Sequence, residues 1–168
     1  MNPKKQGAFA NIRDLWNFLQ PALLLFHYLM FLQNVKPMEV VVIKEIRVMY
    51  VVAENGPEGA KKAFDKLEKH LTTLKGRKFY GTFLNEEYMA CVELEEQDSP
   101  SEKEVSTGII PGGRYLKKKI ENWMENLDKI GSTFGSMAAT NAEDKSRPRI
   151  EFYRSMKELF LLLPIHDE

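Results

Sequence analysis

The sequence predicts an α+β domain in which duplicated strand–helix–strand–strand units form an antiparallel sheet with two main helices. Two observations predict this fold. A strand-like run, a helical apolar pattern and two short strand-like runs follow one another in residues 38–96, and the same order returns in residues 105–165. The helical stretches 61–71 and 117–127 also align without a gap, with apolar residues at matching positions.

The first repeat opens with a β-branched run that predicts a strand over residues 38–53, broken near Arg47. Pro57 suits the first turn of a helix, and apolar residues at helical spacing follow over residues 61–74. Gly76 then favours a C-terminal cap. The remaining elements of this repeat are two short strands, over residues 78–84 and 88–94.

The second repeat is predicted to contain the same elements. Its first strand, over residues 105–116, is interrupted by Gly112 and Gly113, which indicate a bulge or a close approach of the two halves. A helix is expected over residues 117–130, followed by an insertion over residues 131–147. The last two strands are predicted over residues 149–154 and 158–165.

An apolar segment at residues 1–37 precedes the domain, which we expect at residues 38–168. Residues 15–35 contain no Asp, Glu, Lys or Arg. We predict an N-terminal helix there that covers apolar surface or forms a homodimer contact. The alternative is a membrane anchor, because a span needs ~20 predominantly apolar residues. We therefore expect a cytoplasmic protein, with attachment to a membrane through residues 15–35 as the alternative.

Charge and composition argue against several classes of function. Lys plus Arg and Asp plus Glu both number 24, and this balance argues against direct nucleic-acid binding. A single cysteine, Cys91, excludes an internal disulfide and a cysteine-rich zinc site. The three histidines have no spacing typical of metal ligands, so we expect neither a metal nor a cofactor.

Five short motifs, taken together in their order and spacing, resemble those of GyrI-like domains. They are Gly56-Pro57 followed by Ala63-Phe64-x-x-Leu67, Ala90-Cys91-Val92-Glu93-Leu94, Gly112-Gly113-Arg114-Tyr115, Pro148-Arg149-Ile150-Glu151-Phe152-Tyr153 and Leu161-Leu162-Leu163-Pro164-Ile165.

The GyrI-like family includes effector-binding domains of multidrug-sensing regulators, proteins that protect gyrase from toxins, and hydrolases of cyclopropane-containing alkylators. The resemblance implies a stand-alone domain that binds amphipathic or aromatic small molecules, cations among them, in a cleft between the repeats. Sequestration or sensing would then be its function, with a protein partner as a further expectation. Two departures stand out: Glu87-Tyr88-Met89 replaces an Arg-x-Asp that many members carry, and residues 1–37 cannot supply a helix-turn-helix region.

Glu151 is the leading candidate for the site. Alternate residues of a strand share a face, so Arg149, Glu151 and Tyr153 should point to one side, and Ile150 and Phe152 to the other. A desolvated carboxylate there would have a raised pKa and would attract a flat cation or act as a general base. The alternative is that Glu151 lies on a solvated face or pairs with a neighbouring arginine; the resemblance favours the ligand role.

Aromatic residues complete the predicted site, because aromatic rings stack on planar ligands and attract cations. Tyr115 and Tyr153 occupy motif positions, whereas Trp123 aligns with Leu67 and suits a core role equally well. Two functions stay open: a non-catalytic binder, and a hydrolase with Glu151 as general base and Tyr115 or Tyr153 as proton donor. The predicted ligand-binding residues are Glu151, Tyr153, Tyr115, Phe83, Tyr88 and Trp123.

Overall fold

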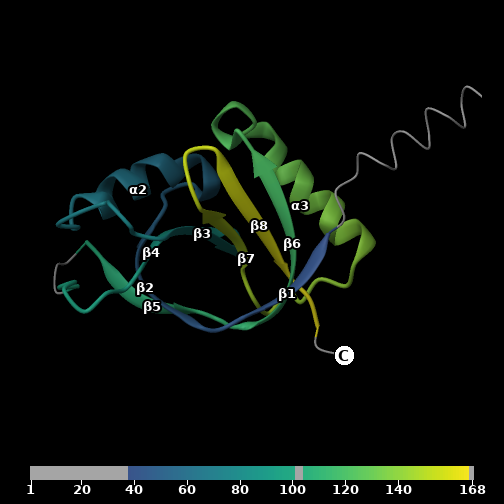
Figure 1. Cartoon of the computed structure of the whole chain (residues 1–168), viewed down its shortest axis with the longest axis horizontal. Helices are drawn as coiled ribbons and strands as arrows, with labels where there is room; N and C mark the ends of the chain where they lie inside the picture. Colours follow the sequence, from purple (N-terminus) through teal and green to yellow (C-terminus); the bar gives the residue numbers. More distant parts are fainter. Residues whose placement is uncertain (1–37, 101–103, 167–168) are drawn as a thin grey trace, which may run out of the picture. The chain divides into compact units, whose positions relative to one another are not determined.

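The structure, a computed structural model, describes residues 38–100 and 104–166. These residues form an α+β domain with one eight-stranded antiparallel sheet, in the order β1-β6-β8-β7-β3-β4-β2-β5 (Figure 1). The elements are, in chain order, β1 (Glu39–Ile43), β2 (Ile46–Val52), the 3₁₀ turn η1 (Gly56–Gly59), α2 (Ala60–Glu68), β3 (Phe79–Leu84), β4 (Glu87–Glu93), β5 (Ser106–Ile110), β6 (Gly113–Glu121), the 3₁₀ turn η2 (Trp123–Glu125), α3 (Asp128–Thr140), β7 (Arg149–Tyr153) and β8 (Glu158–Pro164).

The strand pairing repeats between the two halves, as the sequence predicts. In the first half β2 pairs with β4 and β4 with β3; in the second half β6 pairs with β8 and β8 with β7. The first strand of each half pairs with a strand of the other half. Strand β1 pairs with β6, and β5 pairs with β2 in the equivalent way. Strands β3 and β7 are equivalent and pair with each other at the centre. The domain is therefore an internal duplication with exchanged first strands.

Two bends curl the sheet. Strands β1 and β2 are separated only by Lys44 and Glu45, and β5 and β6 only by Pro111 and Gly112. A Cβ atom on Gly112 would lie 2.8 Å from the backbone nitrogen of Glu45. The two bends are therefore in close contact, which agrees with the close approach of the halves that the glycines indicated. The predicted break near Arg47 is confirmed: the strand is interrupted at Lys44 and Glu45, and Arg47 itself pairs opposite Ile109 in the ladder.

The second helix is the main error of the sequence prediction. Residues 113–121 form β6, and α3 occupies most of the segment predicted to be an insertion. Tyr115 and Leu116 are adjacent in sequence and are buried on opposite faces of β6. Adjacent side chains point to opposite sides in a strand but not in a helix. The real helix buries Phe134 and Met137, but its glycines and serines weaken the helical signal.

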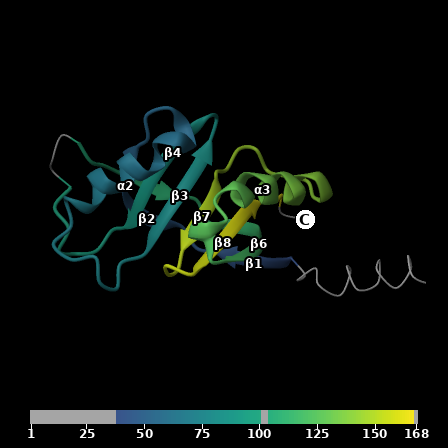
Figure 2. The ribbon, with the colours of Figure 1, turned by 90° about the horizontal axis from the view of Figure 1, so that it is seen from above.

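Both helices lie on one side of the sheet, α2 over β2 and β4, and α3 over β8 (Figures 1 and 2). Helix α2 buries Ala63 and Leu67 against Met49 and Tyr88, and α3 packs against Leu159 and its neighbours. The opposite, helix-free face carries a third buried cluster, formed by Val48, Tyr80, Cys91, Ile110, Tyr115, Ile150 and Leu162.

The predicted helix or anchor at residues 15–35 lies outside the described residues. Within residues 38–100 and 104–166, no helix has the length and apolar character that a membrane crossing requires.

Candidate functional site

The central strand β7 places Glu151 on the helix-bearing face of the sheet. Ile150 is fully buried in the cluster on the other face, and Tyr153 packs with the α3 cluster, so the predicted alternation along this strand is confirmed. Glu151 stands opposite Gly81 of β3 and Leu161 of β8. Its side chain therefore lies at the middle of the sheet.

Two tyrosine hydroxyls hold the Glu151 carboxylate. Tyr88 and Tyr153 both donate to Oε2, at 2.7 and 2.5 Å, and their oxygens are 3.2 Å apart. The other oxygen, Oε1, accepts no hydrogen bond from a described residue. Nor does Glu151 form an ion pair with any described Lys, Arg or His. The carboxylate is thus hydrogen-bonded at one oxygen and lacks a countercharge within the described part of the chain.

The neighbouring arginines are engaged elsewhere, against the alternative in which they pair with Glu151. Arg149 forms a two-point ion pair with Glu143, with N–O distances of 2.6 and 2.8 Å. The Arg147 guanidinium bonds to Asp144 and to backbone carbonyls, including that of Gly112.

Burial raises the pKa of Glu151, and the hydrogen bonds from Tyr153 and Tyr88 offset part of that rise. The tyrosine pKa values rise as well, through burial first and then through the adjacent Glu151 charge. Both hydroxyls therefore stay protonated and act as donors. The three groups form a hydrogen-bonded triad with one negative charge at most.

Gly81 provides the space in which the triad fits. A Cβ atom at this position would lie 2.0 Å from the Tyr88 hydroxyl and 2.8 Å from Glu151 Oε2. Any side chain at Gly81 would consequently displace the two polar groups that meet there.

Aromatic rings from three elements surround the triad. The Tyr153 ring packs edge-on against Trp123 of η2, at a centroid distance of 4.9 Å, and against Phe64 of α2, at 5.4 Å. Phe79 of β3 stands opposite Tyr153 and meets Phe64 at 6.3 Å. Phe64 and Phe79 are absent from the predicted site. Phe64 lies in one of the quoted motifs, but its helical spacing indicated only a core position.

Tyr115 does not join this cluster, although the sequence predicted that it would. It is fully buried on the helix-free face, where its hydroxyl donates to the Pro111 carbonyl and its ring carries the Arg147 guanidinium. Tyr115 therefore stabilises the β5–β6 bend. Tyr115 entered the predicted site through its motif position, and that position does not tell which face of the sheet the side chain occupies.

Phe83 lies at the margin of the site. It packs against the α2 cluster and lines a shallow surface hollow of about 530 Å³ with Val52, Pro57 and Glu86, among others. A second hollow, of about 360 Å³, opens beside Tyr80 and Glu93. Glu151 lines neither hollow.

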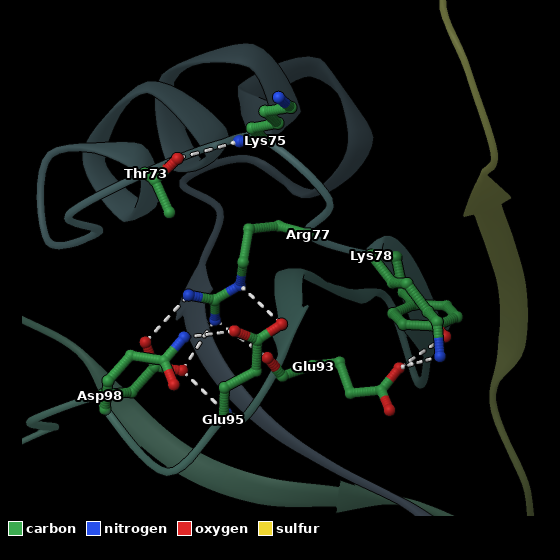
Figure 3. Close-up of polar contacts among 9 residues, drawn as sticks. Thr73, Lys75, Arg77, Lys78, Glu93, Glu95 and Asp98 are labelled. Carbon is green, nitrogen blue, oxygen red and sulfur yellow. Dashed lines mark hydrogen bonds and ion pairs between the residues drawn. The ribbon is translucent and has the colours of Figure 1, made fainter.

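A separate polar cluster around Arg77 is structural (Figure 3). The Arg77 guanidinium donates to both carboxylate oxygens of Asp98, at 2.8 and 2.6 Å, and to the carbonyl of Glu93. Asp98 also accepts a bond from the backbone of Glu95. Both side chains are almost fully buried, so the cluster ties the segment between the halves to the start of β3.

The described residues contain no group of three His, Cys, Asp or Glu side chains arranged to hold a metal ion. Cys91 is buried in β4, and burial raises its thiol pKa to about 12, which disfavours the reactive thiolate.

Comparison with known proteins finds the fold among solved structures. No family model matches the sequence, and no curated protein does. An integron cassette protein from the mobile metagenome of Vibrio cholerae is similar with a TM-score of 0.61 and 16% identity, over 78% of this chain and 97% of that one. The protein SAV2435 bound to tetraphenylphosphonium is similar with a TM-score of 0.51 and 8% identity, over 78% and 94%. At these identities the likeness shows a shared fold.

Proposed function

We propose that this protein binds aromatic, cationic small molecules at Glu151, for sequestration or sensing. The observation that carries the proposal is a half-buried carboxylate with no described countercharge, held by a tyrosine whose ring packs against further aromatic rings. Burying an unpaired charge is costly, and a bound cation would offset that cost. Glu151 Oε1, which has no described partner, is the atom we expect to face the cation.

The aromatic rings suit the same ligand. Trp123, Tyr153 and Phe64 belong to different elements, and the Tyr153 ring packs edge-on against each of the other two. Rings in this arrangement offer faces and edges to a ligand that carries aryl groups, and their faces attract positive charge. The similarity to SAV2435 supports this choice of ligand, because that structure holds tetraphenylphosphonium, an organic cation with four phenyl groups.

Hydrolysis is the second candidate, favoured by one feature of the triad. A carboxylate with a raised pKa beside two hydroxyl donors could serve as a general base for a water attacking a strained ring or similar electrophile. Of the two proton donors expected from the sequence, Tyr153 donates to Glu151 and would serve, whereas Tyr115 lies on the other face.

The Glu151→Gln variant tests both functions, because it keeps the side-chain shape and removes the charge. Titration of the full chain with tetraphenylphosphonium should give an affinity lower by about 10- to 100-fold, the usual effect of losing a charged hydrogen-bond partner. For a neutral electrophile, by contrast, the variant should retain binding and lose turnover.

Glu93→Gln is the matched control. Glu93 is also half-buried, near a tyrosine hydroxyl, but on the helix-free face beside Tyr80. The Glu93→Gln variant should bind tetraphenylphosphonium with the same affinity as the wild type. Equal affinities of wild type and Glu151→Gln for every cation tried would refute the assignment of Glu151.

A further inference from the structure

The surface next to Trp123 exposes large apolar side chains on two segments that are tied together. Trp123 Nε1 donates to the Ser155 carbonyl at 2.9 Å, and the Asn122 backbone nitrogen donates to the Lys157 carbonyl at 2.7 Å. These bonds join η2 to the turn between β7 and β8. The turn exposes Met156, and η2 and the residue that precedes α3 expose Met124 and Leu127.

Their exposure is high for residues of this kind. Met156 is 69% exposed, Leu127 59% and Met124 51%. Scattered apolar residues need no explanation, but here three of them lie on adjoining segments beside the aromatic wall of the candidate site. We name Met124, Leu127 and Met156 the apolar lip.

We propose that the apolar lip receives the outer aryl groups of the bound cation, so that the site prefers bulky aryl cations to compact ones. This inference rests on the proposed function. Three contacts connect the lip to Glu151. The lip adjoins Trp123, Trp123 packs on Tyr153, and Tyr153 donates a hydrogen bond to Glu151. A ligand with its charge at Glu151 and several phenyl groups would extend outward over this surface.

The chemistry of the lip suits a small molecule. Two of its three residues are methionines, whose flexible and polarisable side chains adapt to ligands of different shape. The lip consists of three side chains, whereas a protein interface involves about 20–30 residues on each side. A stable protein interface needs about 800 Å² per partner, so the lip is too small to hold a second chain by itself.

The test compares a bulky and a compact cation on the full chain. The chain has two tryptophans, Trp16 and Trp123, so a Trp16→Phe background makes fluorescence report on Trp123 alone. In that background the double variant Met124→Gln, Met156→Gln keeps side-chain length and removes apolar character. We expect it to bind tetraphenylphosphonium on the order of tenfold more weakly, and tetraethylphosphonium as before.

The control removes apolar character elsewhere. Val42 and Ile109 are 76% and 59% exposed on β1 and β5, and the double variant Val42→Thr, Ile109→Thr should leave both affinities unchanged. If the lip variant binds tetraphenylphosphonium like the wild type while Glu151→Gln does not, the lip assignment fails and the Glu151 site stands. A lip variant that changes only the oligomeric state, measured by light scattering, would also overturn the assignment. If the wild type binds neither cation, both proposals fail.

Discussion

At the scale of single residues, the site depends on the protonation of Glu151. Burial favours the neutral carboxylic acid, and the two tyrosine donors favour the carboxylate. Burial dominates, so the pKa lies above its ordinary value of 4.5. A cation and a proton should therefore compete for the same group.

This competition gives a pH-dependent affinity. Binding of tetraphenylphosphonium should weaken as the pH falls through the raised pKa of Glu151, already above pH 4.5. Tyr88→Phe removes a hydrogen bond to the charged form, so it should move the midpoint to higher pH. Titrations over a pH series measure both effects, with Glu151→Gln as the variant that should show no such midpoint. A wild-type affinity that is constant across the series would contradict the prediction.

Alanine substitutions at two glycines should have opposite effects on stability, because one glycine lies against the site and the other does not. Gly81→Ala should destabilise the fold and displace the triad, because its Cβ atom would clash with Tyr88 and Glu151. Gly131→Ala, in α3 with no atom within 4 Å of the added Cβ, should stabilise the protein by about 0.5–1 kcal/mol. Denaturant unfolding measures both changes. Equal effects of the two substitutions would show that Gly81 is not needed for space.

At the scale of elements, the buried ion pair between Arg77 and Asp98 holds the chain segment that links the two halves. Arg77 Nε approaches Glu95 at 3.5 Å but has no hydrogen-bond partner, so Asp98 carries most of the hydrogen bonding. Burial alone would raise the pKa of Asp98, yet bonds from Arg77 and the Glu95 backbone lower it below 3.8. The stabilisation is therefore present at neutral pH and lost as the pH falls through this lowered pKa.

Asp98→Asn should lower the free energy of unfolding by about 3 kcal/mol at neutral pH, because it removes the carboxylate that accepts two hydrogen bonds from the buried Arg77 and leaves only the more exposed Glu95 to offset the charge. The control is Asp65→Asn, which breaks an exposed helical pair with Lys61 and should change stability by about 0.5 kcal/mol or less. Urea unfolding of the two variants checks the contrast. A loss for Asp98→Asn as small as that for Asp65→Asn would mean that solvent reaches the pair.

At the scale of the whole domain, the exchanged strands make each half depend on the other. Among the described strands, β1 pairs only with β6, from the second half, and β5 pairs only with β2, from the first. The central pair β3–β7 also joins the halves. Neither repeat can complete its hydrogen bonding without the other.

We therefore expect residues 38–100 and 104–168, produced separately, to lack the cooperative thermal unfolding of the full chain, as followed by circular dichroism. Mixing the two fragments should restore part of the β-sheet signal. A fragment that unfolds cooperatively by itself would show that the exchanged pairs are dispensable.

Much of the fold was predictable where a pattern is local. The strands β3, β4, β7 and β8 begin and end within about two residues of their predicted bounds, because alternation and turn residues define them. The helix over residues 117–130 was wrong: Ile120, Trp123 and Leu127 have a helical spacing, yet Ile120 lies in β6 and Trp123 in η2, and so short a pattern fits a helix or a strand. Only packing against β8 decides between them, and that contact joins residues distant in the chain.

The sequence by itself determined that Glu151 and Tyr153 share a face, because side-chain alternation is a geometric property of any strand. Only the tertiary structure decided which other residues meet them. Tyr88 and Phe64 reach Glu151 and Tyr153 through strand pairing and helix packing, while Tyr115 is turned to the opposite face. Contacts between distant elements depend on sheet order and on the position of the bends, and no local pattern encodes these.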